Sequence, residues 1–270
     1  MENYSILMTV YKKDDPNNAR TSIDSVLNQT VKTDDFVIVC DGELTDALNE
    51  MLAAYEKEHD GLFHIVRLPQ NVGLGAALRH GVPLCKNELI ARMDDDDIAR
   101  ENRCEREVQF MQEHPEVALV GSNVSEFDDD PQKPLRIKTM PIGYESIRKF
   151  SKKRNPFNHS TVMFRKKAVL DCGNYSEMRT NQDVDLWVRM LNKGYICENI
   201  DEVLVDFRFD KNTLARRKEW KNSQLLIAVW KNFRKLGYCS YWDYVCVKWI
   251  QIAMYIMPNK LLSWVYDNLR

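Results

Sequence analysis

The chain has 270 residues, of which 44% are hydrophobic and 29% charged, enough apolar material for a large domain with a substantial core. Its 38 basic and 40 acidic side chains leave a net charge of −2, so the charge balance gives no indication of a nucleic-acid partner. The seven cysteines are odd in number, widely spread and without a C-x-x-C pair, which disfavours a disulfide framework or a zinc site and fits a reducing cytosol.

Targeting and membrane-spanning segments are not expected. The first residues lack a basic stretch followed by a long apolar core, and no apolar run approaches about 18 residues. We therefore expect a protein that is neither secreted through a signal peptide nor anchored by a spanning helix.

Continuous apolar runs alternate with amphipathic segments in the first part of the chain. Strands are predicted at residues 5–10, 35–40, 63–66 and 89–93, and helices at residues 19–28, 44–58, 74–79 and 98–113. Such alternation implies an α/β fold in which a mostly parallel sheet has helices on both faces. Ligands bind at the carboxyl ends of the strands in sheets of this kind. Tyr11, Asp41, Arg67 and Asp94 each follow one of these strands, so we expect them along one edge.

Four consecutive carboxylates, Asp94 to Asp97, follow the strand at residues 89–93. Adjacent acids repel one another, so such a cluster is tolerable mainly when a cation neutralises it, and Mg²⁺ or Mn²⁺ prefers oxygen ligands. Side chains alternate in an extended segment, so Asp94 and Asp96 can share one ion while Asp95 and Asp97 face elsewhere. The alternatives are a solvated acidic turn, or Asp97 as the N-cap of the helix that follows.

The segment Asn71 to Gly75 opens the helix at residues 74–79, and its glycines allow close backbone approach at a helix N-terminus. It matches neither G-x-G-x-x-G nor the P-loop pattern, which argues against a dinucleotide cofactor or a P-loop nucleotide site. A plain glycine helix entry is the alternative interpretation.

The second part of the chain continues with short strands at residues 117–120 and 123–125, a strand in the second half of 155–164, and one at 203–209. A helix with the apolar stripe Val184, Trp187, Val188 and Leu191 ends at Gly194. Asp183 lies in its first turn, where a simple N-cap is the alternative role, and Asp185 can pair with Arg189. His159 precedes a buried strand, and a structural histidine is its simpler interpretation.

The composition changes near residue 210, where segments rich in Trp, Tyr, Lys and Arg begin. Helices are predicted at about residues 214–236, 241–257 and 259–270, so we expect a domain at 1–210 and an amphipathic helical appendage at 211–270. Val245, Trp249, Ile252 and Ile256 recur at helical spacing, interrupted by Lys248 and Gln251. Such a helix can lie in a membrane interface or pack on the first domain.

Seven segments, taken together and in this order, resemble family 2 glycosyltransferases with the GT-A fold, in particular those of bacterial polysaccharide, O-antigen and capsule assembly. The resemblance covers about residues 4–210. The matching segments are Ser5–Tyr11, Ser22–Thr30, Cys40–Gly42, Leu68–Gly75, Ala91–Asp97, His159–Phe164 and Gln182–Trp187.

The resemblance implies a nucleotide-sugar donor, with a UDP-sugar as the default, a divalent metal (Mn²⁺ or Mg²⁺) and inversion at the anomeric carbon. By position, Asp96 and Asp94 would form the metal-binding D-x-D motif, and Asp183 would be the catalytic base. The residues expected around the nucleotide sugar are Tyr11, Asp41, Arg67, Asn71, Gly73, Arg92, Asp94 and Asp95, and those expected on the acceptor side are His159, Gln182 and Trp187.

The sequence departs from the family pattern at three positions. Gln182 replaces an acid that is common before the base, Asp95 replaces a small residue, and Asp210 stands where some relatives carry a metal-binding His. The last departure puts the full set of metal ligands in doubt. A sugar nucleotidyltransferase and a catalytically silent binding module are the alternatives. A nucleotidyltransferase should carry a glycine-rich loop after its first strand, where this chain has Tyr11 to Asp15, and a silent module should have lost Asp96 or Asp183.

The expected function is therefore transfer of a hexose or N-acetylhexosamine to a glycan, lipid-linked by family analogy, in cell-surface polysaccharide synthesis. The chemistry agrees with the residues, because a diphosphate leaving group needs its developing charge neutralised and an attacking hydroxyl must lose a proton. The expected location is the cytoplasm, at the inner face of the cell membrane, with peripheral contact through the C-terminal helices.

Overall fold

The computed structural model describes residues 1–209, 219–258 and 261. Its strands are β1 (Tyr4–Val10), β2 (Asp35–Cys40), β3 (Phe63–Arg67), β4 (Leu89–Met93), β5 (Ile98–Ala99), β6 (Val117–Phe127), β7 (Arg136–Lys138), β8 (Met163–Arg165) and β9 (Ile196–Arg208). Its helices are α1 (Pro16–Leu27), α2 (Asp46–Glu58), α3 (Leu74–Leu84), α4 (Arg103–Glu113), α5 (Tyr144–Ser151), the 3₁₀ turn η1 (His159–Thr161), α6 (Lys166–Asp171), α7 (Gln182–Lys193), α9 (Trp220–Lys235) and α10 (Tyr241–Ile256).

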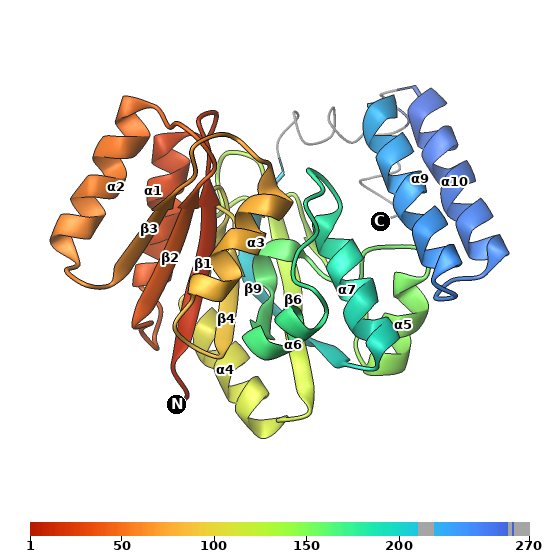
Figure 1. Ribbon diagram of the computed structural model, residues 1–270, viewed down its shortest axis with the longest axis horizontal. Helices are drawn as coiled ribbons and strands as arrows, with labels where there is room; N and C mark the ends of the chain where they lie inside the picture. Colours follow the sequence, from red (N-terminus) through yellow and green to blue (C-terminus); the bar gives the residue numbers. More distant parts are fainter. Residues whose placement is uncertain (210–218, 259–260, 262–270) are drawn as a thin grey trace.

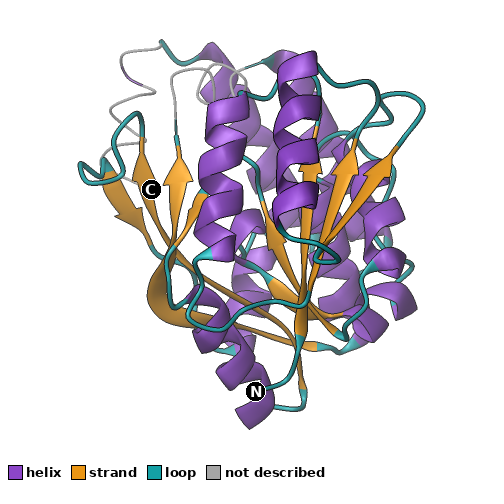
Figure 2. Ribbon diagram, turned by 90° about the vertical axis from the view of Figure 1, so that its left-hand side faces the viewer, coloured by secondary structure: helices purple, strands orange, loops and turns teal. Residues whose placement is uncertain are grey.

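The strands form one sheet in the order β3-β2-β1-β4-β8-β6-β9-β5, with β7 paired to β6. Strands β1 to β4 are parallel to one another, β8 runs antiparallel between β4 and β6, and β9 is parallel to β6. Helices cover both faces (Figures 1 and 2). The predicted α/β fold with a mostly parallel, helix-flanked sheet is therefore confirmed.

The pairing register aligns the carboxyl ends of the parallel strands. Val10 pairs with Cys40, Cys40 pairs with Arg67, and Met8 pairs with Met93. The polar residues that follow these strands therefore meet along one edge of the sheet, as the topology of parallel strands requires.

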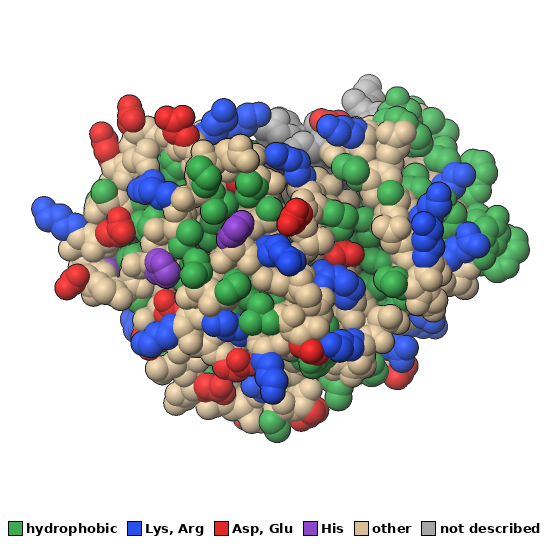
Figure 3. Space-filling view, in the orientation of Figure 1, with side chains coloured by type: hydrophobic (Ala, Val, Ile, Leu, Met, Phe, Trp, Pro, Cys, Tyr) green, Lys and Arg blue, Asp and Glu red, His purple; other side chains and the backbone are tan. Residues whose placement is uncertain are grey.

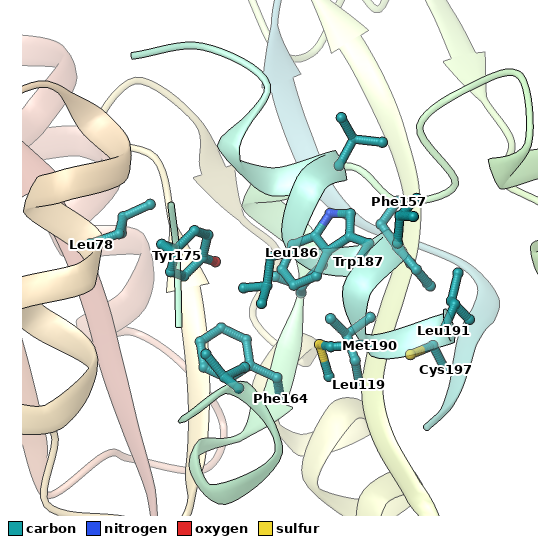
Figure 4. Packing of buried hydrophobic residues seen from close by; sticks show 14 of the residues in the cluster. Leu78, Leu119, Phe157, Phe164, Tyr175, Leu186, Trp187, Met190, Leu191 and Cys197 are labelled. Carbon is teal, nitrogen blue, oxygen red and sulfur yellow. The ribbon is translucent and has the colours of Figure 1, made fainter. Parts of the chain in front are cut away.

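Each face of the sheet has its own core, because successive side chains of a strand point to opposite faces. On one face Ile6, Met8 and Phe36 pack under α1, α2 and α4, and on the other Leu7 and Val37 pack under α3, α6 and α7. Figure 4 shows the second core, where Phe157, Tyr175 and Leu186 surround Trp187. Burying one such large side chain contributes about 1.5–3 kcal/mol.

The predicted C-terminal helices are present as α9 and α10, which lie side by side at the end of the molecule opposite α2 (Figure 1). Helix α9 buries Val229, Trp230 and Phe233 in the same core as Trp187, whereas α10 buries Val247 alone. The predicted boundary near residue 210, Asp210 itself and most of the predicted helix at 259–270 lie outside the described residues, so the domain division stays a prediction. No helix in the described ranges is long and apolar enough to cross a membrane.

Three local predictions were wrong. The helix predicted at 98–113 begins at Arg103, because Ile98 and Ala99 instead pair with β9 as β5, and Asp97 is not a helix cap. The two strands predicted between residues 117 and 125 are one strand, β6, with irregular register around Ser122. Residues 160 and 161, placed in a predicted strand, instead belong to η1, where the Thr161 hydroxyl donates to the Asn158 carbonyl at 2.9 Å and favours a turn.

Candidate active site

The turn of Asp94 to Asp97 is held on one side by the Ser22 hydroxyl and by the buried ion pair of Arg103 and Glu107. Ser22 Oγ donates to the Asp94 carbonyl at 2.7 Å. Arg103 Nη2 donates to the Arg92 carbonyl at 2.7 Å while its Nε donates to Glu107 Oε1 at 3.0 Å, and both side chains are fully buried. These bonds fix the backbone of the turn on the α1 and α4 side of the sheet.

Arg92 is the buried counter-ion of the turn. Its side chain is fully buried, and both terminal nitrogens donate to the Asp94 carboxylate. The sequence predicts that Arg92 lies near the nucleotide, but in the structure its guanidinium is committed to Asp94. Contact with a ligand therefore requires a rearrangement of this pair.

Asp95 points toward Asp14, which the sequence analysis did not single out. The two carboxyl groups are hydrogen-bonded to each other, and Asp14 Oδ2 also accepts from Tyr11 N at 2.7 Å. Burial raises the pKa of Asp14 to about 6, and burial together with the charge of Asp14 raises the pKa of Asp95. The two acids therefore share a proton from about pH 6 upward.

Asp96 and Asp97 have different surroundings. Burial and the neighbouring Asp94 raise the pKa of Asp96 to about 6. Arg208 supports the turn here, because its Nε donates to the Asp96 carbonyl at 3.1 Å and its backbone N–H donates to Asp97 Oδ1 at 2.8 Å. Asp97, fully buried, ties the turn to the end of β9.

The acids of this turn fit a hard divalent cation only in part. Burial and, after it, the charge of neighbouring acids raise the pKa values of Asp14 and Asp96, and carboxylate oxygens suit Mg²⁺ or Mn²⁺. Within the described ranges, however, no three His, Cys, Asp or Glu side chains are arranged to hold a metal ion. Asp94 and Asp96 can therefore supply part of a coordination sphere that phosphate oxygens of a ligand complete.

Asp41 organises the glycine-containing loop of Asn71 to Gly73. Its carboxylate accepts hydrogen bonds from Asn71 Nδ2 at 2.9 Å, Val72 N at 2.7 Å and Gly73 N at 2.9 Å. Gly73 has φ +94°, and a Cβ there would lie 2.7 Å from Cγ of Arg179, which in turn donates to Asn71 Oδ1. The nucleotide roles of Tyr11, Asp41, Asn71 and Gly73 remain predictions, and the structure adds a loop-holding role for Asp41.

Arg67 ends β3 at the same edge of the sheet. Its side chain is exposed and donates to Asn49 Oδ1 at 2.6 Å. Unlike Arg92, it is free to reach a ligand without breaking a buried ion pair.

Asp183 lies one residue inside the start of α7, after Asn181 in the left-handed conformation with φ 61°. Asn155, which the sequence analysis did not assign a role, donates from Nδ2 to Asp183 Oδ2 at 2.5 Å. Burial raises the pKa of Asp183, while this bond and the charge of Arg92 act in the opposite direction. The charge of Arg92 thus acts on both Asp94 and Asp183, which links the acid turn to the expected base.

The expected acceptor-side residues are more buried than the sequence indicates. Gln182 is 4% exposed, and no partner for its Oε1 lies among the described residues. Trp187 is fully buried, and the described residues likewise offer its indole Nε1 no acceptor. His159 Nε2 lies 3.1 Å from the Tyr175 hydroxyl, and burial and the charge of Arg92 lower the pKa of His159, so the ring is neutral.

Comparison with protein families identifies the class of this site. Residues 5–173 match the sequence model described as "Glycosyl transferase family 2". This match confirms the resemblance found in the sequence and decides against a sugar nucleotidyltransferase.

Two curated relatives align along nearly the whole chain. The "Amylovoran biosynthesis glycosyltransferase AmsE" of Erwinia amylovora is 30% identical over 265 residues, 98% of each chain. The "UDP-Gal:alpha-D-GlcNAc-diphosphoundecaprenol beta-1,3-galactosyltransferase" of Escherichia coli is 34% identical over 265 residues, 98% of this chain and 95% of that one. The alignments include the C-terminal helices as well as the sheet.

Solved structures share the fold at low identity. Mannosyltransferase PcManGT from Pyrobaculum calidifontis, in complex with GDP-Man and Mn²⁺, superposes with a TM-score of 0.67 at 14% identity over 97% of this chain and 72% of that one. Residues 1–349 of TarS from S. aureus, in complex with UDP-GlcNAc, give 0.65 at 12% identity over 98% and 79%. At these identities the likeness shows the fold alone, and it confirms the predicted GT-A fold.

The shared proton of Asp14 and Asp95 predicts a pH dependence of stability in metal-free protein. Because the pKa of Asp14 is raised to about 6 on folding, its stabilising contribution is present at low pH and is lost as the pH rises through about 6. Asp14→Asn should keep the bond from Tyr11 N but remove one of the two charges. In chelator, its free energy of unfolding in urea should fall less between about pH 4 and pH 7 than that of wild type.

Asp15→Asn is the matched control, because Asp15 caps α1 and Asn caps equally well. It should retain the wild-type slope of stability against pH. An unchanged slope in Asp14→Asn would contradict the shared proton.

Proposed function

Since this chain belongs to glycosyl transferase family 2, we propose that it transfers a hexose or an N-acetylhexosamine from a UDP-sugar to a lipid-linked glycan, with inversion at the anomeric carbon. The product would be a cell-surface polysaccharide, and one relative is named for amylovoran biosynthesis. The observation that carries the proposal is that Arg92, the counter-ion of Asp94 in the acid turn, also acts electrostatically on Asp183. A binding module needs no base there.

The relatives support the choice of donor and acceptor. The Escherichia coli relative is named for UDP-Gal as donor and a diphosphoundecaprenol-linked acceptor sugar, and TarS has been solved with UDP-GlcNAc. The exposed Arg67 and the loop of Asn71 to Gly73 lie at the strand ends where this fold binds nucleotides.

The proposed reaction is a single displacement. The acceptor hydroxyl oxygen bonds to the anomeric carbon as the bond to the diphosphate oxygen breaks, so UDP leaves from the opposite face. Asp183 takes the hydroxyl proton, and its raised pKa makes it a stronger base than a solvated aspartate. A divalent ion held by Asp94 and Asp96, when bound, supplies Lewis-acid neutralisation of the leaving diphosphate.

On the acceptor side, Gln182 is the best-placed contact. Its buried Oε1 lacks a described partner, which costs about 1–3 kcal/mol until a ligand hydroxyl donates to it. His159 and Trp187 are packed beneath the site with ring centroids 6.0 Å apart. We assign these two the support of α7 rather than direct contact with the acceptor.

Helix α10 supports a peripheral membrane location. Trp242, Trp249 and Ile256 are 75%, 63% and 72% exposed. Figure 3 shows hydrophobic side chains gathered over α10 with basic side chains beside them. The neighbouring helix α9 carries the exposed basic residues Lys231 and Arg234. Trp side chains favour membrane interfaces and basic residues meet anionic lipid, so this face fits the inner surface of the cell membrane, where a lipid-linked acceptor is presented.

Asp183→Asn should lower kcat by about 10²–10⁴-fold, because the variant cannot accept the acceptor proton. UDP affinity, measured by calorimetry, should stay near wild type. The matched control is Asp185→Asn, whose side chain pairs with Arg189 on the same helix. Normal turnover by Asp183→Asn, or loss of turnover in the Asp185 variant instead, would refute the base assignment.

Chelation should stop turnover, and added Mn²⁺ or Mg²⁺ should restore it, because the acid turn alone cannot neutralise the diphosphate. Asp96→Ala should weaken UDP binding when metal is present and leave the weaker metal-free binding unchanged. Full activity in excess chelator would show that no metal takes part.

The full chain should float with anionic liposomes and be partly released by salt. Trp242→Ser with Trp249→Ser should reduce the bound fraction by about tenfold or more, since each large side chain contributes about 1.5–3 kcal/mol on burial. Leu84→Ser with Leu170→Ser is the control, because these exposed residues lie on α3 and α6. Equal flotation of both variants would exclude the α10 face as the membrane contact.

A further inference from the structure

Asn155 is held in a single orientation by its own segment. Its Oδ1 accepts from the backbone N–H of Phe157 at 3.3 Å, so the amide nitrogen must face the other way, toward Asp183 Oδ2 at 2.5 Å. Pro156 restricts Asn155 to extended backbone conformations. The network therefore fixes which end of the amide meets the carboxylate.

The segment after Asn155 is anchored to the sheet and to α7. The Pro156 carbonyl accepts from Asn199 Nδ2 of β9 at 3.2 Å. The Phe157 ring packs edge-on against Trp187 with centroids 6.0 Å apart (Figure 4). Trp187 lies one turn after Asp183 on α7, so the donor and acceptor of the Asn155–Asp183 bond rest on the same packed aromatic pair.

The segment before Asn155 is anchored to the C-terminal helices. Trp230 of α9 donates from Nε1 to the Lys152 carbonyl at 2.8 Å, and the Tyr238 hydroxyl lies 2.5 Å from Ser151 Oγ. Lys153 Nζ lies 3.5 Å from Asp243 of α10. Trp230 is 1% exposed, so its bond is shielded from water.

We propose that Asn155 is the positioning residue of Asp183 and that the α9–α10 pair holds Asn155 in place. This inference rests on the proposed function, in which Asp183 is the base. The bond to Oδ2 fixes the rotation of the carboxylate, and a donated hydrogen bond favours its ionised form. The C-terminal helices thereby act on the chemical step although none of their described side chains bonds to Asp183.

In the described ranges, the ionisable groups shown to interact with the charge of Asp183 are the Arg92 guanidinium, from β4, and the Tyr175 hydroxyl, from the segment before α7. Neither is altered by a change at Asn155. A variant that removes the Asn155 donor should therefore raise the pKa of Asp183 further and move the acid limb of the pH profile to higher pH.

The test is the pH dependence of kcat/KM in the full chain. Asn155→Ala removes the donor, and Asn155→Asp keeps an oxygen for Phe157 N while placing an acceptor against Asp183. Both should move the acid limb of the pH profile to higher pH. Both should also lower kcat at neutral pH by about ten- to a hundredfold, because the free energy of a hydrogen bond to a charged group corresponds to about that factor. Trp230→Phe should move the limb in the same direction by a smaller amount. UDP affinity should stay near wild type in all three variants.

Asn192→Ala, at an exposed position of α7, should keep the wild-type profile. An unmoved acid limb in both Asn155 variants would overturn the positioning role, and a shift in these without one in Trp230→Phe would overturn the part assigned to the C-terminal helices. If the proposed function itself were wrong, Asp183→Asn would turn over normally, and this outcome is distinct from those of the Asn155 and Trp230 variants.

Discussion

The crowding of five carboxylates at one sheet edge is the constraint on which this site depends. Asp14 and Asp94 to Asp97 gather after β1 and β4, and like charges at such distances cannot all remain ionised in a buried place. The structure offsets their repulsion in two ways. Arg92 neutralises Asp94 from within the core, and Asp14 and Asp95 share a proton.

The placement of Arg92 follows from strand periodicity. Arg92 pairs in register with Leu7, and both side chains point to the face of the sheet covered by α3 and α7. Met93 points to the other face, where Arg103 and Glu107 form their buried pair and hold the Arg92 carbonyl. Strand β4 therefore places the Arg92 guanidinium on one face of the sheet, and the ion pair of Arg103 and Glu107 holds the strand on the other face. Breaking the fully buried pair of Arg103 and Glu107 by removing one partner would cost about 3–5 kcal/mol.

Much of the fold and part of the site followed from local pattern. The apolar runs located β1 to β4 to within one residue, because a strand buried on both faces leaves a continuous apolar signal. The acid turn and Asp183 were found because their residue types and spacing carry a chemical meaning. Roles set by distant partners were missed: β5 exists because β9 offers Ile98 an open edge, and Asp97 bonds to Arg208, far along the chain.

Asn155 and Asp14 were also missed because their roles depend on partners that are distant in the sequence. Asn155 stands before a proline in a basic segment, and nothing in that segment indicates a carboxylate partner. Asp14 lies in a polar loop that is indistinguishable from a solvated one until β1 and β4 are placed side by side. A sequence marks the residues that perform chemistry more readily than those that orient them, because orientation depends on long-range packing.

The C-terminal helices connect the proposed membrane contact to the segment that bonds to the proposed base, Asp183. Helix α10 has 16 residues and buries Val247 alone, and an isolated helix of that length is only marginally stable in water. Its exposed Trp and Ile side chains form the surface proposed to meet the membrane, and its contact with α9 connects that surface to Trp230. Because Trp230 bonds to the backbone three residues before Asn155, we expect a surface that covers α10 to stabilise also the segment proposed to orient Asp183. A membrane that presents the acceptor would thus stabilise the arrangement of the base at the place where the acceptor arrives.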